Sequence, residues 1–355
     1  MDLTKLFTAR AIAAYYNEVA SNAIPYLGAA LFPAKKKAGL DLSWIKGSRG
    51  LPISLMPSNF DAKAKPRNRI GAQKIETEMP FFRESFIVTE KDRQEILRAQ
   101  DKDDIYLKAT LDKIFDDAKN LIDGADVIPE RMIMQLLSPE NGKPSISISA
   151  NDMVYSYNYD PDGSFENNNF MKIVSDSDKW SNADTSYSIA DLKKAIEAVY
   201  TKSGTRPSIA LMSTATLTLL TKSKAVRSAV LAQNTGATVY MTDIVVKNII
   251  SQLLNISIVD YNKKFKDNDG TTHQFYPDNL VTLIPDGALG STWFGTTPEE
   301  ADLMGKSNAA VEIVNTGTAV TTITQPHPVN VSTIVSEIVL PSFERMDECY
   351  VMKVV

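Results

Sequence analysis

The 355-residue sequence has few reactive side chains: one cysteine, Cys349, and two histidines, His273 and His327. A single thiol excludes a disulfide within the chain, and two histidines leave few ligands for a zinc site. Neither histidine lies beside a nucleophile motif, so we expect no catalytic triad. These shortages predict a protein that is not an enzyme and that binds no metal or cofactor.

Phosphate-binding loops and long apolar runs are missing as well. Residues 47–50 (GSRG) lack the lysine and the helix that a phosphate loop requires. Residues 267–270 (DNDG) resemble part of a calcium loop, but Tyr276 occupies the position of its glutamate ligand, so we expect a turn there. No apolar run reaches about 18 residues, and the early Asp2 is unlike a signal peptide. We therefore expect no membrane span and a protein made in a reducing cytoplasm.

The chain carries its charge unevenly. Its formal net charge is −5, yet residues 1–82 contain 12 Lys/Arg and 6 Asp/Glu, whereas the remaining residues contain 26 and 37. A basic arm on an acidic body is typical of nucleic-acid binding, and equally of an arm that lies on the next copy of the same protein. Only Phe60 is interleaved with the basic cluster Lys65, Arg67 and Arg69, which is thin for a surface that stacks bases.

Residues 46–82 are too irregular for a helix. Two strands are predicted, at Arg49–Met56 and Arg69–Phe82, on either side of a polar tip that contains Pro57 and Pro66. A two-stranded ribbon is marginal by itself in water, because it buries too little apolar surface to offset the ordering of its backbone. We therefore expect this ribbon to lie on a surface outside itself, which another copy of the chain would provide.

The strongest helical pattern follows a break at residues 101–104. Apolar residues recur on one stripe from Leu107 to Ile122, and most charged residues lie elsewhere. Gly124 and Pro129 are expected to weaken or kink this helix before it resumes. A continuous helix here would cover about 35 residues and roughly 50 Å, at about 1.5 Å per residue.

The rest of the sequence mixes short helices and strands. Residues 164–187 are predicted to form a loop and a domain boundary, and a capped helix is predicted from Ser188 to its stop at Gly204. The turn at 267–270 is expected to join a strand at 256–261 to the next strand. Further helices are predicted at 214–221, 224–233 and 243–254, and further strands at 145–150, 153–159, 281–285, 331–340 and 349–355. Because helices and strands do not alternate regularly, an α+β fold is favoured over a doubly wound sheet.

Several stretches, taken in order, resemble one known family. They are the N-terminal arm that leads into residues 46–82, the helix FDDAKNLIDGADVIPERMIMQLLSPENGK, the stretch 247–300 and the closing LPSFERMDECYVMKVV. In these residues the chain resembles the major capsid proteins of tailed bacteriophages, of the lambda type (the product of the lambda E gene and its relatives). The likeness spans nearly the whole chain and is carried by the ordered set, since no single motif is as specific as a zinc pattern.

The resemblance implies a particular architecture. It is the tailed-phage major capsid fold, with an N-terminal arm, an extended β-hairpin loop, a peripheral domain with a long spine helix, and an axial domain. By this resemblance the arm covers 1–45, the extended loop 46–82, the peripheral domain 83–180 and 330–355, and the axial domain 181–329.

The resemblance also implies a structural role. Copies would form pentamers and hexamers that tile an icosahedral shell around double-stranded DNA, without sequence-specific contact to the DNA. A separate scaffold protein is implied, because the sequence begins directly with the arm, and portal and decoration proteins are further partners. No membrane is involved, and the protein would occupy the virion after assembly in the host cytoplasm. Five basic residues of the extended loop are predicted to contact a neighbouring subunit, the alternative being a solvated loop tip: Arg49, Lys63, Lys65, Arg67 and Arg69.

Two alternative functions remain. One is an encapsulin-like shell protein of the same fold. The other is a non-enzymatic nucleic-acid-binding or peptide-binding module that uses the basic N-terminal region. Deletion of residues 46–82 distinguishes a binding module from a capsid protein. A binding module would remain a folded monomer and lose its ligand, whereas a capsid protein would no longer assemble.

Overall fold

The structure is a computed structural model that describes residues 8–20, 26–46, 73–92, 94, 105–150, 153–233, 241–267, 269–303, 309–326 and 329–355. The chain forms two compact units. The first unit comprises Met1–Leu42, Glu76–Ile133 and Ser291–Ser342, and the second unit comprises Ser43–Ile75, Met134–Gly290 and Phe343–Val355. None of the helices in the described ranges is long and apolar enough to cross a membrane.

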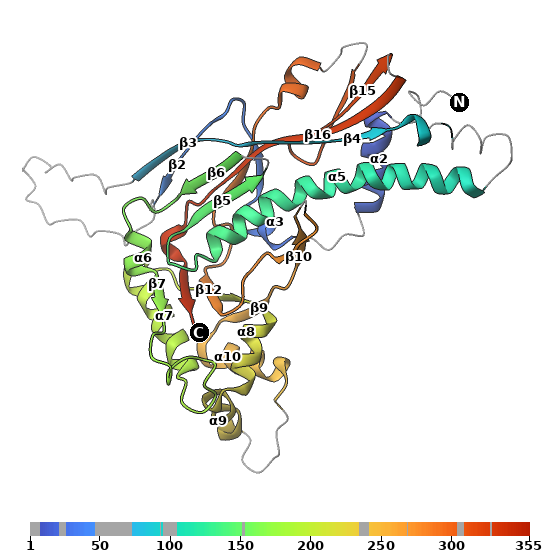
Figure 1. Ribbon diagram of the computed structural model, residues 1–355. Coiled ribbons are helices and arrows are strands. Elements are labelled where there is room, and N and C mark those ends of the chain that lie inside the picture. The colour runs from blue at the N-terminus through green and yellow to red at the C-terminus, as the bar shows by residue number, and fades with distance from the viewer. Residues whose placement is uncertain are drawn as a thin grey trace, which may run out of the picture. The chain divides into compact units, whose positions relative to one another are not determined.

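The first unit is built on a six-stranded sheet (Figure 1). Its strands follow the order β1 (Ala34–Lys36), β13 (Ser291–Phe294), β16 (Val329–Ser342), β15 (Thr318–Pro326) and β14 (Ala309–Val314), and β4 (Phe81–Val88) also pairs with β16. β1 runs parallel to β13, and the other pairings are antiparallel. β16 is the centre of the sheet, because different parts of it pair with β13, β15 and β4.

Two helices pack against this sheet. Ile12 and Tyr16 of α2 (Ala9–Ala20) share a buried cluster with Ile122 of α5 (Ile105–Leu137) and with Val320 and Val335 of the sheet. Ile12 and Tyr16 lie four residues apart and so project from one face of α2, which is the face that the sheet covers. The first unit also contains α3 (Leu27–Leu31) and the π-helical turn η1 (Glu299–Leu303).

The long helix α5 continues through Pro129, so the weak point predicted at Gly124 and Pro129 does not end it. A proline inside a helix removes one hydrogen bond and costs about 3 kcal/mol or more. The following turns are deeply buried: Met132, Met134 and Leu136 are each 0% exposed. Burial of one such side chain contributes about 1.5–3 kcal/mol, so together these residues outweigh the cost of the proline.

The second unit contains a five-stranded sheet and four of the helices described. The strand order is β7 (Phe170–Lys172), β17 (Tyr350–Lys353), β12 (Leu280–Ile284), β8 (Ile209–Met212) and β9 (Ser257–Asp260). The helices are α7 (Ser188–Ser203), α8 (Thr214–Lys222), α9 (Lys224–Gln233) and α10 (Asp243–Leu254). Their apolar residues, among them Leu192, Leu217 and Ile250, form one buried cluster with Leu283 and Met352 of the sheet.

Several predicted elements of the second unit are confirmed, and two are wrong in part. Gly204 ends α7 with φ 72, a left-handed conformation that glycine adopts without steric cost. The predicted strands 145–150 and 153–159 form a hairpin of β5 (Ser145–Ala150) and β6 (Met153–Asn158). The turn at 267–270 joins β10 (Lys264–Lys266) to β11 (Thr272–Gln274), and not the strand β9, which pairs with β8. The predicted loop 164–187 contains α6 (Ser164–Asn168) and β7, which are too short to show a period in the sequence.

The ribbon predicted for residues 46–82 is only partly described. β2 (Asp41–Lys46) and β3 (Gln73–Glu78) form a two-stranded sheet. The predicted strand Arg69–Phe82 is divided by Pro80, because β3 pairs with β2 whereas β4 pairs with β16. The other predicted strand, Arg49–Met56, lies outside the described residues.

Candidate functional site

The five basic residues predicted to contact a neighbouring subunit all lie outside the described residues: Arg49, Lys63, Lys65, Arg67 and Arg69. The strands β2 and β3 flank this stretch of the chain. Lys46 is the last residue described before it, and its side chain belongs to a network of polar contacts in the second unit. We call this site, which consists of Lys46, Asp160, Asp162 and Ser164, the anchor.

The alternation of β2 directs Lys46 inward. Leu42, Trp44 and Lys46 are buried, whereas the residues between them are exposed. The Trp44 ring packs against Tyr159, with ring centroids 5.1 Å apart. The whole Lys46 residue is only 4% exposed, and a buried ammonium group is costly unless anions and hydrogen-bond acceptors surround it.

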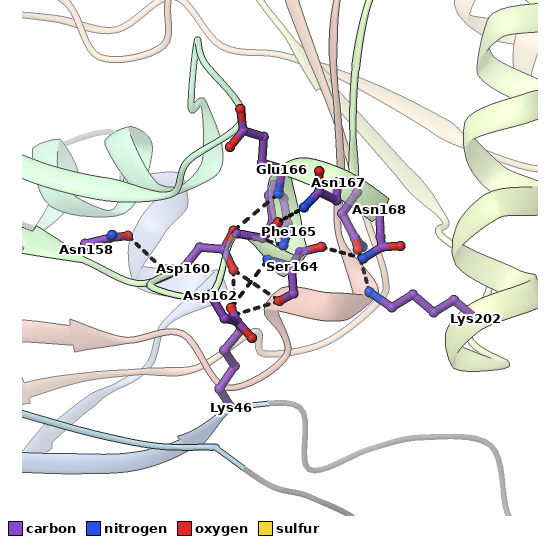
Figure 2. A network of polar contacts seen from close by, with 12 residues as sticks. Lys46, Asn158, Asp160, Asp162, Ser164, Phe165, Glu166, Asn167, Asn168 and Lys202 are labelled. Carbon is purple, nitrogen blue, oxygen red and sulfur yellow. Dashed lines mark hydrogen bonds and ion pairs between the residues drawn. The ribbon is translucent and has the colours of Figure 1, made fainter.

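Two aspartates and a serine provide those acceptors (Figure 2). Lys46 Nζ lies 2.6 Å from Asp160 Oδ1 and 3.0 Å from Asp162 Oδ1. It also donates to Ser164 Oγ at 3.0 Å. The Asp160 side chain is 0% exposed and that of Asp162 is 50% exposed, so the ammonium group is held between one buried and one solvated carboxylate.

Asp160 also holds the start of α6. Its Oδ2 accepts hydrogen bonds from the backbone N–H groups of Phe165 at 2.9 Å and Glu166 at 3.3 Å. Its Oδ1 accepts a third from the Ser164 hydroxyl at 3.1 Å. The first N–H groups of a helix have no partner within the helix, so one buried carboxylate satisfies both these groups and Lys46.

The electrostatics of the anchor favour the charged form of Asp162. The hydrogen bond from Lys46 holds the pKa of Asp162 well below its usual range, and the N–H of Ser164 acts in the same direction. Within the described ranges no three His, Cys, Asp or Glu side chains are grouped so that they could hold a metal ion. The carboxylates of the anchor are engaged with Lys46 and the backbone, so the arrangement can fix the end of β2 mechanically.

This anchor was not predicted from the sequence, where Lys46 was counted with the extended loop 46–82. The available signal was the period of β2, where Leu42, Trp44 and Lys46 share one side of the strand. A lysine on the apolar side of a strand implies a buried carboxylate partner, although the sequence does not say which one.

A second buried carboxyl group lies in the first unit. Glu337 of β16 is 1% exposed, and its Oε2 accepts a hydrogen bond from Thr318 at 3.2 Å. Its other oxygen has no hydrogen-bond partner among the described residues. Burial raises the pKa of Glu337 well above its ordinary value, and the nearby Asp126 acts in the same direction. Asp126 itself accepts a hydrogen bond from Tyr16 of α2 at 2.5 Å.

Solved structures of phage proteins share the fold of this chain. The putative capsid protein of a prophage of Escherichia coli CFT073 is similar with a TM-score of 0.59 and 14% identity, over 98% of this chain and 99% of that chain. A phage-related protein from Bordetella bronchiseptica RB50 gives a TM-score of 0.54 and 13% identity, over 96% of both chains. A chain of the capsid asymmetric unit of cyanophage A-1(L) gives a TM-score of 0.51 and 11% identity, over 93% of this chain and 92% of that chain. At these identities the likeness establishes the fold alone.

Sequence comparison identifies the family. No curated protein matches the chain. The family model described as phage major capsid protein E matches residues 8–354. A match over nearly the whole chain favours a capsid protein over an encapsulin-like shell protein and over a nucleic-acid-binding or peptide-binding module. The chain therefore belongs to the phage major capsid protein E family and is a structural protein of the phage capsid.

Proposed function

We propose that copies of this chain form pentamers and hexamers that tile an icosahedral shell around double-stranded DNA. The observation that carries this proposal is the family match over residues 8–354. The net charge of −5 supports a wall that holds DNA without gripping it, because tight binding would require many cationic groups against the phosphates. The chain would then perform no catalysis and would make no sequence-specific contact to DNA.

Within the shell, we assign the four segments of the chain their roles in the family. Residues 1–45 act as the arm and 46–82 as the extended loop, and the remaining residues form the peripheral and axial domains. The basic extended loop lies on a neighbouring copy, whose acidic body complements it. The anchor at Lys46 fixes the root of this loop, so that the loop leaves the subunit in one direction and needs less ordering on assembly.

The other partners follow from the same role. A separate scaffold protein directs assembly, a portal protein occupies one vertex, and decoration proteins bind the outside. Assembly takes place in the host cytoplasm before the shell becomes part of the virion.

Sedimentation velocity with negative-stain imaging tests the assembly. The full chain of 39.1 kDa is expressed with and without the scaffold protein of the same phage. Shells of megadalton size, or discrete pentamers and hexamers, are the expected result. A chain that stays monomeric at high concentration with its scaffold present would refute the proposal.

A charge exchange tests the role of the extended loop. Reversal of all five predicted contact residues to glutamate is expected to abolish assembly and to leave the stability of the free subunit unchanged. In the matched control, each of these lysines is replaced by arginine and each of these arginines by lysine, so that the charge is unchanged. Assembly of the reversed variant at the wild-type level would show that the loop makes no electrostatic contact. The residues are Arg49, Lys63, Lys65, Arg67 and Arg69.

A further inference from the structure

Strand β4 lies at an edge of the sheet in the first unit (Figure 1). It pairs antiparallel with β16 over eight residues, from Phe81 opposite Ile338 to Val88 opposite Val331. The part of the chain that the structure describes contributes no strand to the other side of β4. One side of this strand therefore carries a row of backbone groups that a further strand could pair with.

The hydrogen-bond pattern shows which backbone groups form this row. The N–H of Val339 donates to the carbonyl of Pro80 at 3.3 Å, one step beyond the pairs named above. Bonded pairs alternate in an antiparallel ladder, so alternate residues from Pro80 onward bond to β16. The backbone N–H and C=O groups of Arg83, Ser85 and Ile87 therefore point away from β16, and no described residue bonds to them.

The side chains along this edge protect only its first half. Arg83 and Glu84 are exposed charged residues, whereas Ser85, Phe86 and Ile87 carry no charge, and Ile87 is 48% exposed. The short outer strand β1 differs, because it has three exposed residues and places Lys35 and Lys36 at the sheet border. Short length and lysine are the usual protection of an edge that must stay unpaired. β4 is longer and apolar at its end, which is typical of an edge that is covered in the working state.

We propose that β4 pairs antiparallel with β4 of a second copy, so that one sheet continues across two subunits. This inference rests on the proposed assembly and names one of its contacts. A pairing of a strand with itself needs only one surface, since a two-fold axis presents the same edge from both copies. Main-chain hydrogen bonds between the two edges then contribute to association.

Charge and hydrogen-bond geometry select the register. The residues whose backbone groups point away from β16 must lie opposite one another in the two copies. A two-fold axis through Ser85 meets this requirement, because it places Ser85 opposite Ser85 of the second copy and Arg83 opposite Ile87. In this register Glu84 faces Phe86 of the second copy. An axis through Glu84 would place two carboxylates directly opposite each other, which is unfavourable in a sheet. The axis through Ser85 avoids this repulsion and keeps most of the strand paired.

Cysteine cross-linking tests the register in the assembled full-length protein. Residues opposite each other in a bonded antiparallel pair have Cα atoms about 5.5 Å apart, which a disulfide can span. Ser85→Cys is therefore expected to give a covalent dimer in assembled shells treated with diamide, which accepts the two electrons and two protons of the thiols. The native Cys349 gives little background, because it is 1% exposed and burial raises the pKa of its thiol. Ser251→Cys, on the exposed side of α10, serves as the matched control and should stay monomeric on a non-reducing gel.

Two proline variants test the edge itself. Ser85→Pro removes an N–H that points away from β16, so the free subunit should unfold at nearly the wild-type temperature while assembly is lost or strongly reduced. Glu84→Pro removes an N–H within the β16 ladder and should lower the stability of the free subunit. If wild-type shells form but Ser85→Cys does not cross-link, or if Ser85→Pro assembles normally, the β4 contact is refuted while the proposed function stands. If the wild-type chain forms no assembly, both are refuted.

Discussion

Replacement of Lys46 by methionine would leave the anchor with a buried carboxylate and no cation. Methionine matches the length and apolar stem of lysine, so the change removes the ammonium group with little loss of volume. The Asp160 side chain is 0% exposed and would keep the N–H groups of Phe165 and Glu166 as donors. The variant therefore isolates the contribution of the ion pair from that of the helix cap.

The expected magnitude follows from burial. Removal of one member of a buried ion pair costs about 3–5 kcal/mol, because the other charge remains buried. The donors that Asp160 keeps place Lys46→Met at the lower end, about 3 kcal/mol. Asp162→Asn removes a carboxylate whose side chain is 50% exposed, and an exposed pair contributes about 0–1 kcal/mol. The two aspartates should thus differ although both contact the same ammonium group.

Urea unfolding of the unassembled subunit, followed by tryptophan fluorescence, measures these differences. The double variant Lys46→Met/Asp160→Asn should cost less than the sum of the single variants, because it leaves no unpaired charge, and the cycle gives their coupling. Equal losses for Lys46→Met and Asp162→Asn would refute the reasoning, since burial would then not determine the cost. Strict additivity in the cycle would show that Lys46 and Asp160 do not act as a pair.

Three further variants test other parts of the structure. Burial raises the pKa of Glu337, so the folded state loses stability as the pH rises above 4.5, the ordinary pKa of a glutamate. Glu337→Gln should therefore match the wild-type melting temperature near pH 4 and exceed it increasingly toward pH 8. A difference in melting temperature that does not grow with pH would contradict this. Tyr16→Phe removes the donor to Asp126 and should lower the free energy of unfolding by about 1–2 kcal/mol, with faster hydrogen exchange confined to α2. Unchanged exchange in α2 would show that this hydrogen bond does not stabilise the helix. Gly142→Ala should lower the free energy of unfolding by about 2 kcal/mol, because φ is +73 at this position and the new Cβ would lie 2.6 Å from the ring of Phe170. A variant that unfolds at the wild-type temperature would show that the turn relaxes without loss of stability.

Local chemistry explains what could be predicted from the sequence. The end of α7 was predictable because Gly204 stops a helix through its own backbone conformation. The helix predicted at 243–254 is confirmed as α10, whose start is capped by the neighbouring Thr242. Such signals lie within a few residues of the feature that they determine. The ordered resemblance over the whole chain then supplied the family, which no single motif could.

Long-range contacts explain what could not be predicted. Lys46 and Asp160 are 114 residues apart, and nothing in either neighbourhood names the other. Only the first two residues of β4, Phe81 and Phe82, were predicted as a strand, in a ribbon with β3, whereas the partner of β4 is β16, at the far end of the sequence. The continuity of α5 through Pro129 depends on burial of the turns that follow, which the local sequence does not encode.

The separation of Lys46 from Asp160 also sets an order of events during synthesis. A ribosome adds about 5–20 residues per second, so the carboxylate emerges roughly 6–23 seconds after the lysine that it binds. During that interval the end of β2 lacks the ion pair that fixes it. The contact forms only after about 160 residues have left the ribosome, so a chain that is less than half made holds Lys46 without its partner.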